Sequence, residues 1–181
     1  MLIKFAETPE EIHQIAALNQ RYQKAGLSAD YIKEQGFVSW SYPASLLEQM
    51  HALCPSVIAV KEGKVVAYAL VAVREAASFH QELKLLLEKI EPLALNGKAI
   101  GDHSFYMMGQ LCVDESCRGL ALPDKMYAFH QEQLKDRYDY MITTISLQNT
   151  RSIRVHERSG FETIHEIHDH FGNWVVVVKE F

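Results

Sequence analysis

The sequence predicts one mixed α/β (α+β) domain whose mostly antiparallel sheet is flanked by helices. The first observation is a hairpin: apolar runs at residues 57–60 and 65–73 flank Lys61-Glu62-Gly63-Lys64, a pattern typical of two antiparallel strands and a turn. The second is a strand, helix, strand, helix order over residues 104–159, followed by two closing strands. No repeat, low-complexity tract or flexible linker interrupts residues 1–181, so we expect a single domain.

Each predicted element has a local reason. Thr8-Pro9-Glu10-Glu11 opens a helix because it supplies a cap, a proline in the first turn and acids at the positive end of the helix dipole. Leucines and isoleucines at helical spacing predict an amphipathic helix over residues 79–90, which Pro92 ends. The other predicted elements are strands over residues 2–5, 104–113, 140–146, 161–167 and 174–179, and helices over residues 28–35, 45–53, 123–137 and 150–159.

The composition is that of a globular protein in water. Hydrophobic residues make up 48% and charged residues 23% of the chain, which excludes the disordered and membrane-embedded classes. No apolar run approaches the roughly 20 residues of a transmembrane helix, and residues 1–7 lack the features of a signal peptide. We therefore expect a cytoplasmic protein with no membrane partner. The formal net charge of −5 argues against a nucleic-acid partner.

The first candidate site is residues 112–123, which are expected to form the end of a strand, a tight turn and the start of a helix. Such a turn leaves backbone N–H groups unpaired, and the helix dipole adds partial positive charge at the same place, so the turn suits a pyrophosphate. Arg118 stands at its entrance, whereas Pro123 fits the first helical turn but has no N–H to offer. The amides available to a phosphate are those of Gly119, Leu120, Ala121 and Leu122.

The second candidate site is the predicted helix that follows Asn149. The Asn149 side chain can cap this helix, and Ser152 and His156 share one of its faces because they are four residues apart. Gly160 then provides a left-handed stop, and Phe161 begins a buried strand. Taken alone, this stretch predicts only an ordinary capped helix.

Together, in this order and at this separation, the two segments resemble the cofactor motifs of the GCN5-related N-acetyltransferase (GNAT) superfamily. The upstream turn is similar to Arg/Gln-x-x-Gly-x-Gly/Ala, with Ala121 where glycine is usual and Pro123 where glycine or alanine is usual. The downstream helix matches Asn-x-x-Ala/Ser-x-x-x-Tyr/His-x-x-x-Gly-Phe in register. His156 and Gly172-Asn173-Trp174 are also similar to the phosphinothricin-type branch. The resemblance implies a GNAT-type mixed sheet.

The resemblance further implies an acetyl-CoA-dependent N-acetyltransferase, in which a primary amine of a small-molecule or peptide acceptor attacks the thioester directly. Acetyl-CoA would be the co-substrate. Backbone N–H groups around Leu111 and Cys112 would hold the oxyanion and the pantetheine arm, and His156 would protonate the departing thiolate. The cofactor-binding residues implied are Leu111, Cys112, Val113, Arg118, Gly119, Leu120, Ala121, Leu122, Asn149 and Ser152.

Several assignments stay open at this point. His156 can instead pack and hydrogen-bond without chemistry. Many relatives carry a carboxylate on the strand at residues 104–113, but this strand has no acid before Asp114, so the general base is a water chain, His103, a residue of the segment 36–42, or absent. The missing acid and the Pro123 departure favour an alternative function, a catalytically degenerate acyl-CoA-binding module or sensor of the same fold.

Two other chemistries have weaker support. Cys112 could carry the acyl group, although cysteine is a frequent core residue in strands. His168 and His170 would share a strand face and could serve a metal-dependent hydrolase, but their spacing matches no specific site, so we expect no metal. The three cysteines form no CxxC pair, which argues against a disulfide framework or structural zinc.

The acceptor is not specified by the sequence. Phe37, Trp40 and Tyr42 lie where relatives often build the acceptor wall, which favours an apolar or stacking contact. The helix at residues 79–90 is an insertion relative to a minimal GNAT domain and can shape the acceptor pocket. Dimers are common in relatives, so a homodimer also stays open.

Overall fold

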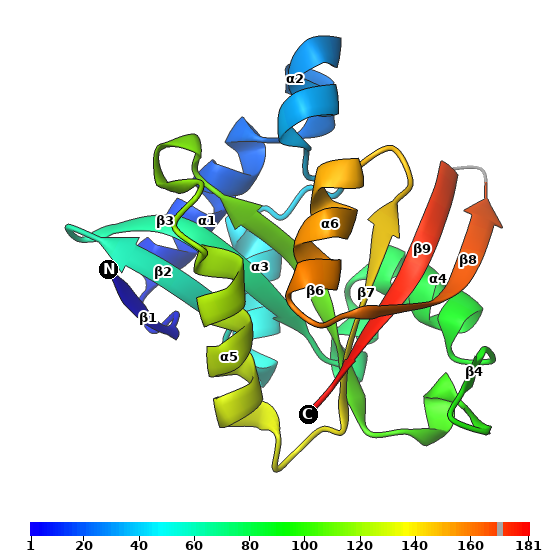
Figure 1. Ribbon diagram of the computed structural model, residues 1–181. Helices are drawn as coiled ribbons and strands as arrows, with labels where there is room; N and C mark the ends of the chain where they lie inside the picture. Colours follow the sequence, from blue (N-terminus) through cyan, green and yellow to red (C-terminus); the bar gives the residue numbers. More distant parts are fainter. Residues whose placement is uncertain (170–171) are drawn as a thin grey trace.

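The computed structural model describes residues 1–169 and 172–181, which form one seven-stranded sheet with helices on both faces (Figure 1). The strand order is β1-β2-β3-β6-β7-β9-β8, and every neighbouring pair is antiparallel except β6 and β7. The predicted mixed, mostly antiparallel sheet is therefore confirmed. Its strands are β1 (Leu2–Phe5), β2 (Val57–Lys61), β3 (Lys64–Ala72), β6 (Phe105–Val113), β7 (Tyr140–Ser146), β8 (Glu162–Asp169) and β9 (Gly172–Glu180).

The helices follow the predicted order, with small differences at their ends. The fourth helix begins after His80, because the His80 Nδ1 atom accepts the amide of Leu83 and caps the helix (3.4 Å). A two-stranded hairpin of β4 (Ala94–Leu95) and β5 (Lys98–Ala99) was not predicted, since strands of two residues leave no periodic signal. The helices are α1 (Pro9–Arg21), α2 (Ala29–Gln35), α3 (Ala44–Leu53), α4 (Gln81–Ile90), α5 (Leu122–Leu134) and α6 (Thr150–Arg158).

Each face of the sheet is covered by its own set of helices. Apolar side chains of α1, α3 and α4 pack against one face in a single large cluster, and those of α5 and α6 pack against the other. Figure 1 shows the second pair lying across the front of the sheet, with α2 projecting beyond its upper edge. Residues on both faces are buried because the central strands lie between these two helical layers.

The sheet opens between β6 and β7. The two strands pair only where Phe105–Met107 meets residues 140–142, and they diverge beyond that point (Figure 1). On the other side of β6 a bulge sets Gly109 and Gln110 opposite Leu70 alone. A bulge bends a strand and leaves backbone groups unpaired. Because β7 diverges from β6, the second half of β6 has a free edge facing the opening.

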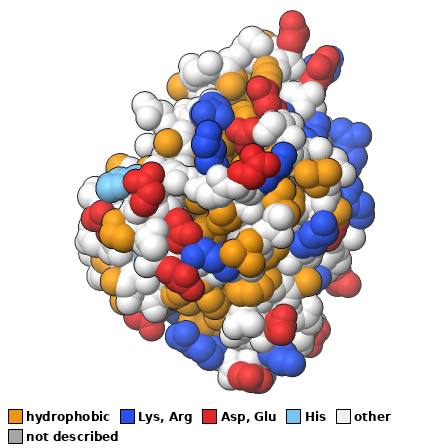
Figure 2. All heavy atoms as spheres, turned by 90° about the vertical axis from the view of Figure 1, so that its left-hand side faces the viewer, with side chains coloured by type: hydrophobic (Ala, Val, Ile, Leu, Met, Phe, Trp, Pro, Cys, Tyr) orange, Lys and Arg blue, Asp and Glu red, His pale blue; other side chains and the backbone are white. Residues whose placement is uncertain are grey.

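Within the described part of the chain, no helix combines the length and apolarity that crossing a bilayer requires. Figure 2 looks onto the side that carries β1, where acidic and basic side chains are interspersed around apolar ones. Met1 and Leu2 are among the exposed large apolar residues. This face thus carries no extended field of a single charge sign.

Candidate active site

The turn between β6 and α5 presents a row of backbone amides. Gly119 (φ 83°) and Ala121 (φ 53°) both adopt left-handed backbone conformations and bend the chain sharply. For alanine this conformation is uncommon, because the Cβ atom crowds the backbone. Among the described residues, no backbone or side-chain acceptor meets the amides of residues 119–122. The turn therefore has the free N–H groups that the sequence predicts for it.

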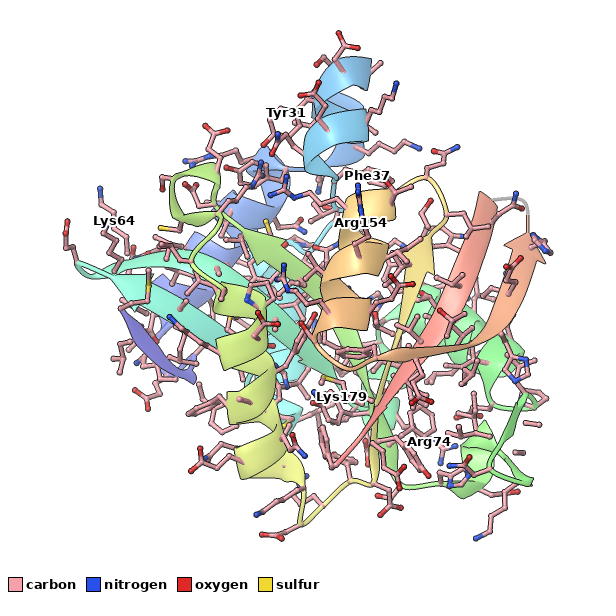
Figure 3. The ribbon with its side chains drawn as sticks, in the orientation of Figure 1. Tyr31, Phe37, Lys64, Arg74, Arg154 and Lys179 are labelled. Carbon is pink, nitrogen blue, oxygen red and sulfur yellow. The ribbon has the colours of Figure 1, made fainter. Side chains whose placement is uncertain are left out.

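The start of α6 is fixed by the side chain of Asn149. Its Oδ1 atom accepts the amide of Ser152 (3.2 Å), and its Nδ2 atom donates to the carbonyl of Phe37 (3.0 Å). Gly36 lies against it with a positive φ of 76°, and a Cβ atom on Gly36 would stand 2.7 Å from Asn149 Oδ1. Asn149 thus caps the helix and ties the segment after α2 to it. In Figure 3, Phe37 lies beside the first turn of α6.

These two helix starts face a common cavity of about 370 Å³. Gln35, Phe37 and Val38 close it from the side of α2. Leu120 is 49% exposed and does not line the cavity, so only its amide can contribute. The other residues that the resemblance implied as cofactor ligands all line it: Leu111, Cys112, Val113, Arg118, Gly119, Ala121, Leu122, Asn149 and Ser152.

Three arginines line this cavity, and two of them are bound to α2. Arg118 donates to Gln35 Oε1 (2.9 Å) and to the hydroxyl of Tyr31 (2.9 Å), and Arg151 donates to the same Gln35 oxygen (3.1 Å). Arg158 also lines the cavity, 3.5 Å from the carboxylate of Asp124. The sequence reasoning missed Arg151 and Arg158, although their place on the motif helix was a signal for them. Their charges suit an anionic ligand.

A second, narrower cavity of about 70 Å³ lies where β6 and β7 separate. Its walls include the bulge at Gly109 and Gln110, the end of β7, and Ser152 and His156 of α6. It shares Leu111, Asn149 and Ser152, as well as Phe37 and Val38, with the first cavity. The two cavities therefore adjoin at the opening of the sheet.

His156 is buried, with 2% of its surface exposed. Its Nδ1 atom is 2.8 Å from the carbonyl oxygen of Ser152, which can only accept, so this nitrogen carries the proton. The Nε2 atom then accepts the hydroxyl hydrogen of Tyr127 (2.8 Å). Burial lowers the pKa of His156 from 6.5 to about 4. In this state the ring is neutral at pH 7 and has no N–H left for a departing thiolate, so its acid role stays a prediction.

Among the described residues, no carboxylate lines the second cavity. On β6 the cavity is lined by the uncharged side chain of Gln110. Its Oε1 atom accepts hydrogen bonds from Asn19 Nδ2 (2.6 Å) and Tyr68 Oη (2.7 Å). His103 lines neither of these two cavities; its Nε2 atom lies 2.8 Å from the carbonyl oxygen of Leu95. Of the general bases considered, the water chain and the segment 36–42 therefore remain.

The acid nearest along the chain, Asp114, serves a structural role. It accepts hydrogen bonds from Ser116 and pairs with Arg21 (2.8 Å). Burial would raise the pKa of Asp114, but these hydrogen bonds and the Arg21 charge outweigh it and hold that pKa below its usual range. Asp114 is therefore a stable carboxylate outside the second cavity.

The structure bears on the two other chemistries to different degrees. Burial raises the pKa of the Cys112 thiol to about 12, so the thiolate that a nucleophile requires is scarce at pH 7. Among the described residues, no group of three or more His, Cys, Asp and Glu side chains could hold a metal ion. His168 lies 2.9 Å from Asn173 Oδ1, while His170 falls outside the described residues.

A third cavity of about 660 Å³ continues from the second toward α4 and the ends of β7, β8 and β9. It shares Phe37, Trp40, Leu86 and Trp174 with the second cavity. Tyr42, expected in an acceptor wall, is 1% exposed and lies in the core behind Gly109 instead. The three cavities thus follow one another from the α5 turn, past the opening of the sheet, to an apolar groove on the side of α4.

Comparison with known proteins identifies the fold. The ribosomal-protein-alanine N-acetyltransferase from Brucella melitensis matches 100% of both chains with a TM-score of 0.66 and 17% identity. Ard1 from Thermoplasma volcanium matches 99% of this chain and 96% of its own with a TM-score of 0.67 and 11% identity. The Salmonella typhimurium protein yncA, solved with its cofactor acetyl-CoA, matches 99% of this chain and 92% of its own with a TM-score of 0.61 and 15% identity.

No protein-family model and no curated protein sequence matches the chain. At 11–17% identity the structural likeness shows the fold rather than the activity. The expectation drawn from the two motifs is confirmed at this level: the chain has the fold of the GCN5-related N-acetyltransferases.

Proposed function

We propose that the protein is an acetyl-CoA-dependent N-acetyltransferase that moves an acetyl group to a primary amine by direct attack. The observation that carries this proposal is the row of three adjoining cavities at the opening between β6 and β7, which we call the passage. One end of the passage offers free amides and arginines, and the other offers an apolar groove. Such a passage lets two substrates meet at the strand edge from opposite faces of the sheet.

The pyrophosphate of the cofactor would bind at the turn before α5. Free amides of residues 119–122 and the positive end of the α5 dipole favour it. Arg118 and Arg151 add charge after exchanging Gln35 for phosphate oxygens. The pantetheine arm would then lie along the free edge of β6 at residues 111–113, next to Asn149 and Ser152. Its amides can pair with this edge as an extra strand would.

Acyl transfer would take place at the bulge of β6. Backbone N–H groups near Leu111 and Cys112 can hold the thioester oxygen as it gains negative charge. The amine nitrogen forms the new C–N bond, the C–S bond breaks, and the sulfur leaves with the electron pair. The amine proton passes to water in the passage, and a proton from water, or from His156, neutralises the thiolate.

A second candidate function has its own supporting observation. The second cavity lacks a lining carboxylate among the described residues, and His156 has both ring nitrogens engaged. A chain that binds acyl-CoA without transferring the acyl group, a degenerate module or sensor, would look the same. Two of the structural neighbours were solved with CoA or acetyl-CoA bound, which supports cofactor binding under either function.

Two measurements separate these functions. Calorimetry with CoA should show saturable one-to-one binding. If the folded protein does not bind CoA, both the transferase and the sensor proposals are wrong. Steady release of thiol from acetyl-CoA, in the presence of an amine panel, should then exceed the rate without amine. Binding without any amine-dependent release would favour the sensor.

A substitution at His156 tests its role as the acid. In His156→Gln, lost turnover with intact CoA affinity would support the acid role, and unchanged turnover would exclude it. A cytoplasmic location, a homodimer and the lack of a nucleic-acid partner stay predictions.

A further inference from the structure

The third cavity is walled by aromatic rings from distant parts of the chain. Phe37 and Trp40 come from the segment between α2 and α3, and Trp174 comes from β9. Leu85 and Leu86 of α4, with Leu147 and Ile167, complete the apolar surface. At about 660 Å³ the groove is larger than the cofactor cavity and lies within the usual range for small-molecule sites.

The rings that line the groove are held in place by the fold. Trp40 meets the edge of His80 at a centroid distance of 5.5 Å, and its carbonyl accepts Asn19 Nδ2 (3.1 Å). Phe37 has Lys24 Nζ over its ring at 4.9 Å. Trp174 lies in the register of β9, opposite Ser146 on one side and Ile167 on the other. Rings fixed before binding lose little conformational entropy when a ligand packs between them.

The lysines of the groove already have partners. Lys24 Nζ donates to Gln148 Oε1 (2.8 Å) and lies over the Phe37 ring, and Lys89 is engaged in an interaction of its own. The Glu82 side chain is 61% exposed, and His80 Nδ1, which accepts the Leu83 amide, has no proton to offer it. An uncharged aromatic body can pack against the rings and leave the lysine contacts in place.

The second cavity, at about 70 Å³, is much smaller than the groove, at about 660 Å³, and the two share Phe37, Trp40 and Trp174. We therefore expect the reacting amine to enter the small cavity and the bulk of the acceptor to lie in the groove. There the three aromatic rings offer faces and edges for stacking.

We propose that the acceptor is a primary amine joined by a short linker to an aromatic ring, and that the ring packs between Trp40 and Trp174. This inference rests on the proposed function and specifies the substrate class of the same site. Two sources carry this chemistry: a free arylalkylamine, or a peptide whose first residue is aromatic.

Binding can be tested without turnover, because both tryptophans of the chain line the groove. The probe is phenethylamine, added to protein saturated with CoA, with butylamine as the aliphatic control. Phenethylamine should change the tryptophan emission in a saturable way, at concentrations about tenfold below any effect of butylamine. Equal effects of the two amines, or none from either, would overturn the inference. Absent CoA binding would instead mean that the proposed function has failed.

Measurements of acetyl transfer provide a second test of the aromatic acceptor. Trp174→Ala should lower kcat/KM for phenethylamine about tenfold, mainly through KM, while butylamine changes little and Trp174→Phe retains most of the activity. Phe79→Ala, at an exposed aromatic residue outside the groove, should leave both amines unaffected. A peptide that begins with phenylalanine, compared with one that begins with alanine, identifies the source. An aromatic preference in either pair supports the inference, and an equal loss for both amines in Trp174→Ala would contradict it.

Discussion

The cofactor cavity and the aromatic groove meet at one opening of the sheet, yet they are built in different ways. The cofactor cavity is formed largely by two short runs of sequence, each a turn followed by a helix start. The groove is assembled from separate parts of the chain, at Lys24 and at residues 37–41, 82–89, 144–148, 167 and 172–174. The cofactor cavity can be recognised from local sequence motifs, whereas the groove forms only when distant segments come together in the folded chain.

The segment after α2 is the exception that belongs to both regions. Phe37 lines all three cavities, and its carbonyl accepts the Nδ2 atom of Asn149. Changes in this segment should therefore disturb both ends of the passage, whereas changes in the motif turn or in Trp174 should disturb one end only. The substitutions below, from the largest expected effect to the smallest, test this division.

Gly36→Ala should have the largest effect, because the new Cβ atom would stand 2.7 Å from Asn149 Oδ1 and force the cap of α6 to move. CoA affinity should fall about tenfold or more, and aromatic amine binding should weaken as well. Gly63→Ala is the matched control: Gly63 has the same φ of 76° but nothing within 4 Å of its Cβ position. It should lose only the backbone cost of about 1 kcal/mol. Calorimetry and chemical denaturation compare the two, and equal losses would contradict the account.

Arg118→Ala should disturb the cofactor end alone. A lost hydrogen bond from a charged donor to phosphate is worth about 1.5–3 kcal/mol, so CoA should bind about tenfold to a hundredfold more weakly. Phenethylamine binding should change little. Arg154→Ala removes an equal charge from the exposed face of α6, where the Arg154 Nε atom reaches only the carbonyl of Thr150 (Figure 3). Equal weakening in both variants would mean that charge, not position, matters.

His156 lies at the junction, and its burial predicts how stability depends on pH. The unfolded chain binds a proton near pH 6.5, but the folded chain binds it only near pH 4. Stability is therefore complete above about pH 6.5 and falls as the pH drops toward 4, by about 3 kcal/mol for this one group. His130, whose pKa burial lowers to about 3, adds a fall of the same sign.

Chemical denaturation between pH 7 and pH 4 measures this dependence. His156→Gln should flatten the slope by about one proton. If His156→Gln leaves the slope as it is, the imidazole is not held neutral by burial, and the case against a direct proton donor weakens.

The smallest effect is expected from Cys112→Ala. Because burial raises the pKa of the thiol to about 12, Cys112 should carry no acyl group, and turnover should stay within about twofold. Iodoacetamide at pH 7 should likewise leave the activity intact. Loss of turnover by more than about tenfold, in a variant that still binds CoA, would point to a covalent intermediate at this end of the passage.

The difference between the two regions also explains what could be predicted from the sequence. Asn149, Ser152 and His156 share one helix, so their spacing alone places them together. The fold followed because strand and helix periods are local signals. Leu120 was predicted to offer its backbone amide, and the left-handed turn leaves that amide without an acceptor among the described residues while the side chain is exposed.

The rest depended on contacts between distant residues. Gln35 bridges Arg118 and Arg151 across more than 80 residues of sequence, and no local pattern announces such a bridge. Tyr42 looked like part of the acceptor wall, but Trp174, which is far away in the sequence, lies there instead. Side-chain direction after a turn and the pairing of remote segments are set by tertiary packing, which periodicity does not encode.

The central claim is that the cofactor cavity and the aromatic groove form one passage that holds both substrates at once. A bisubstrate compound, with CoA sulfur joined through an acetyl bridge to the nitrogen of phenethylamine, spans the passage in a single molecule. Calorimetry should show that it binds at least about tenfold more tightly than CoA, because the second contact becomes intramolecular, and that Trp174→Ala removes the gain. Binding no tighter than that of CoA alone would contradict the claim.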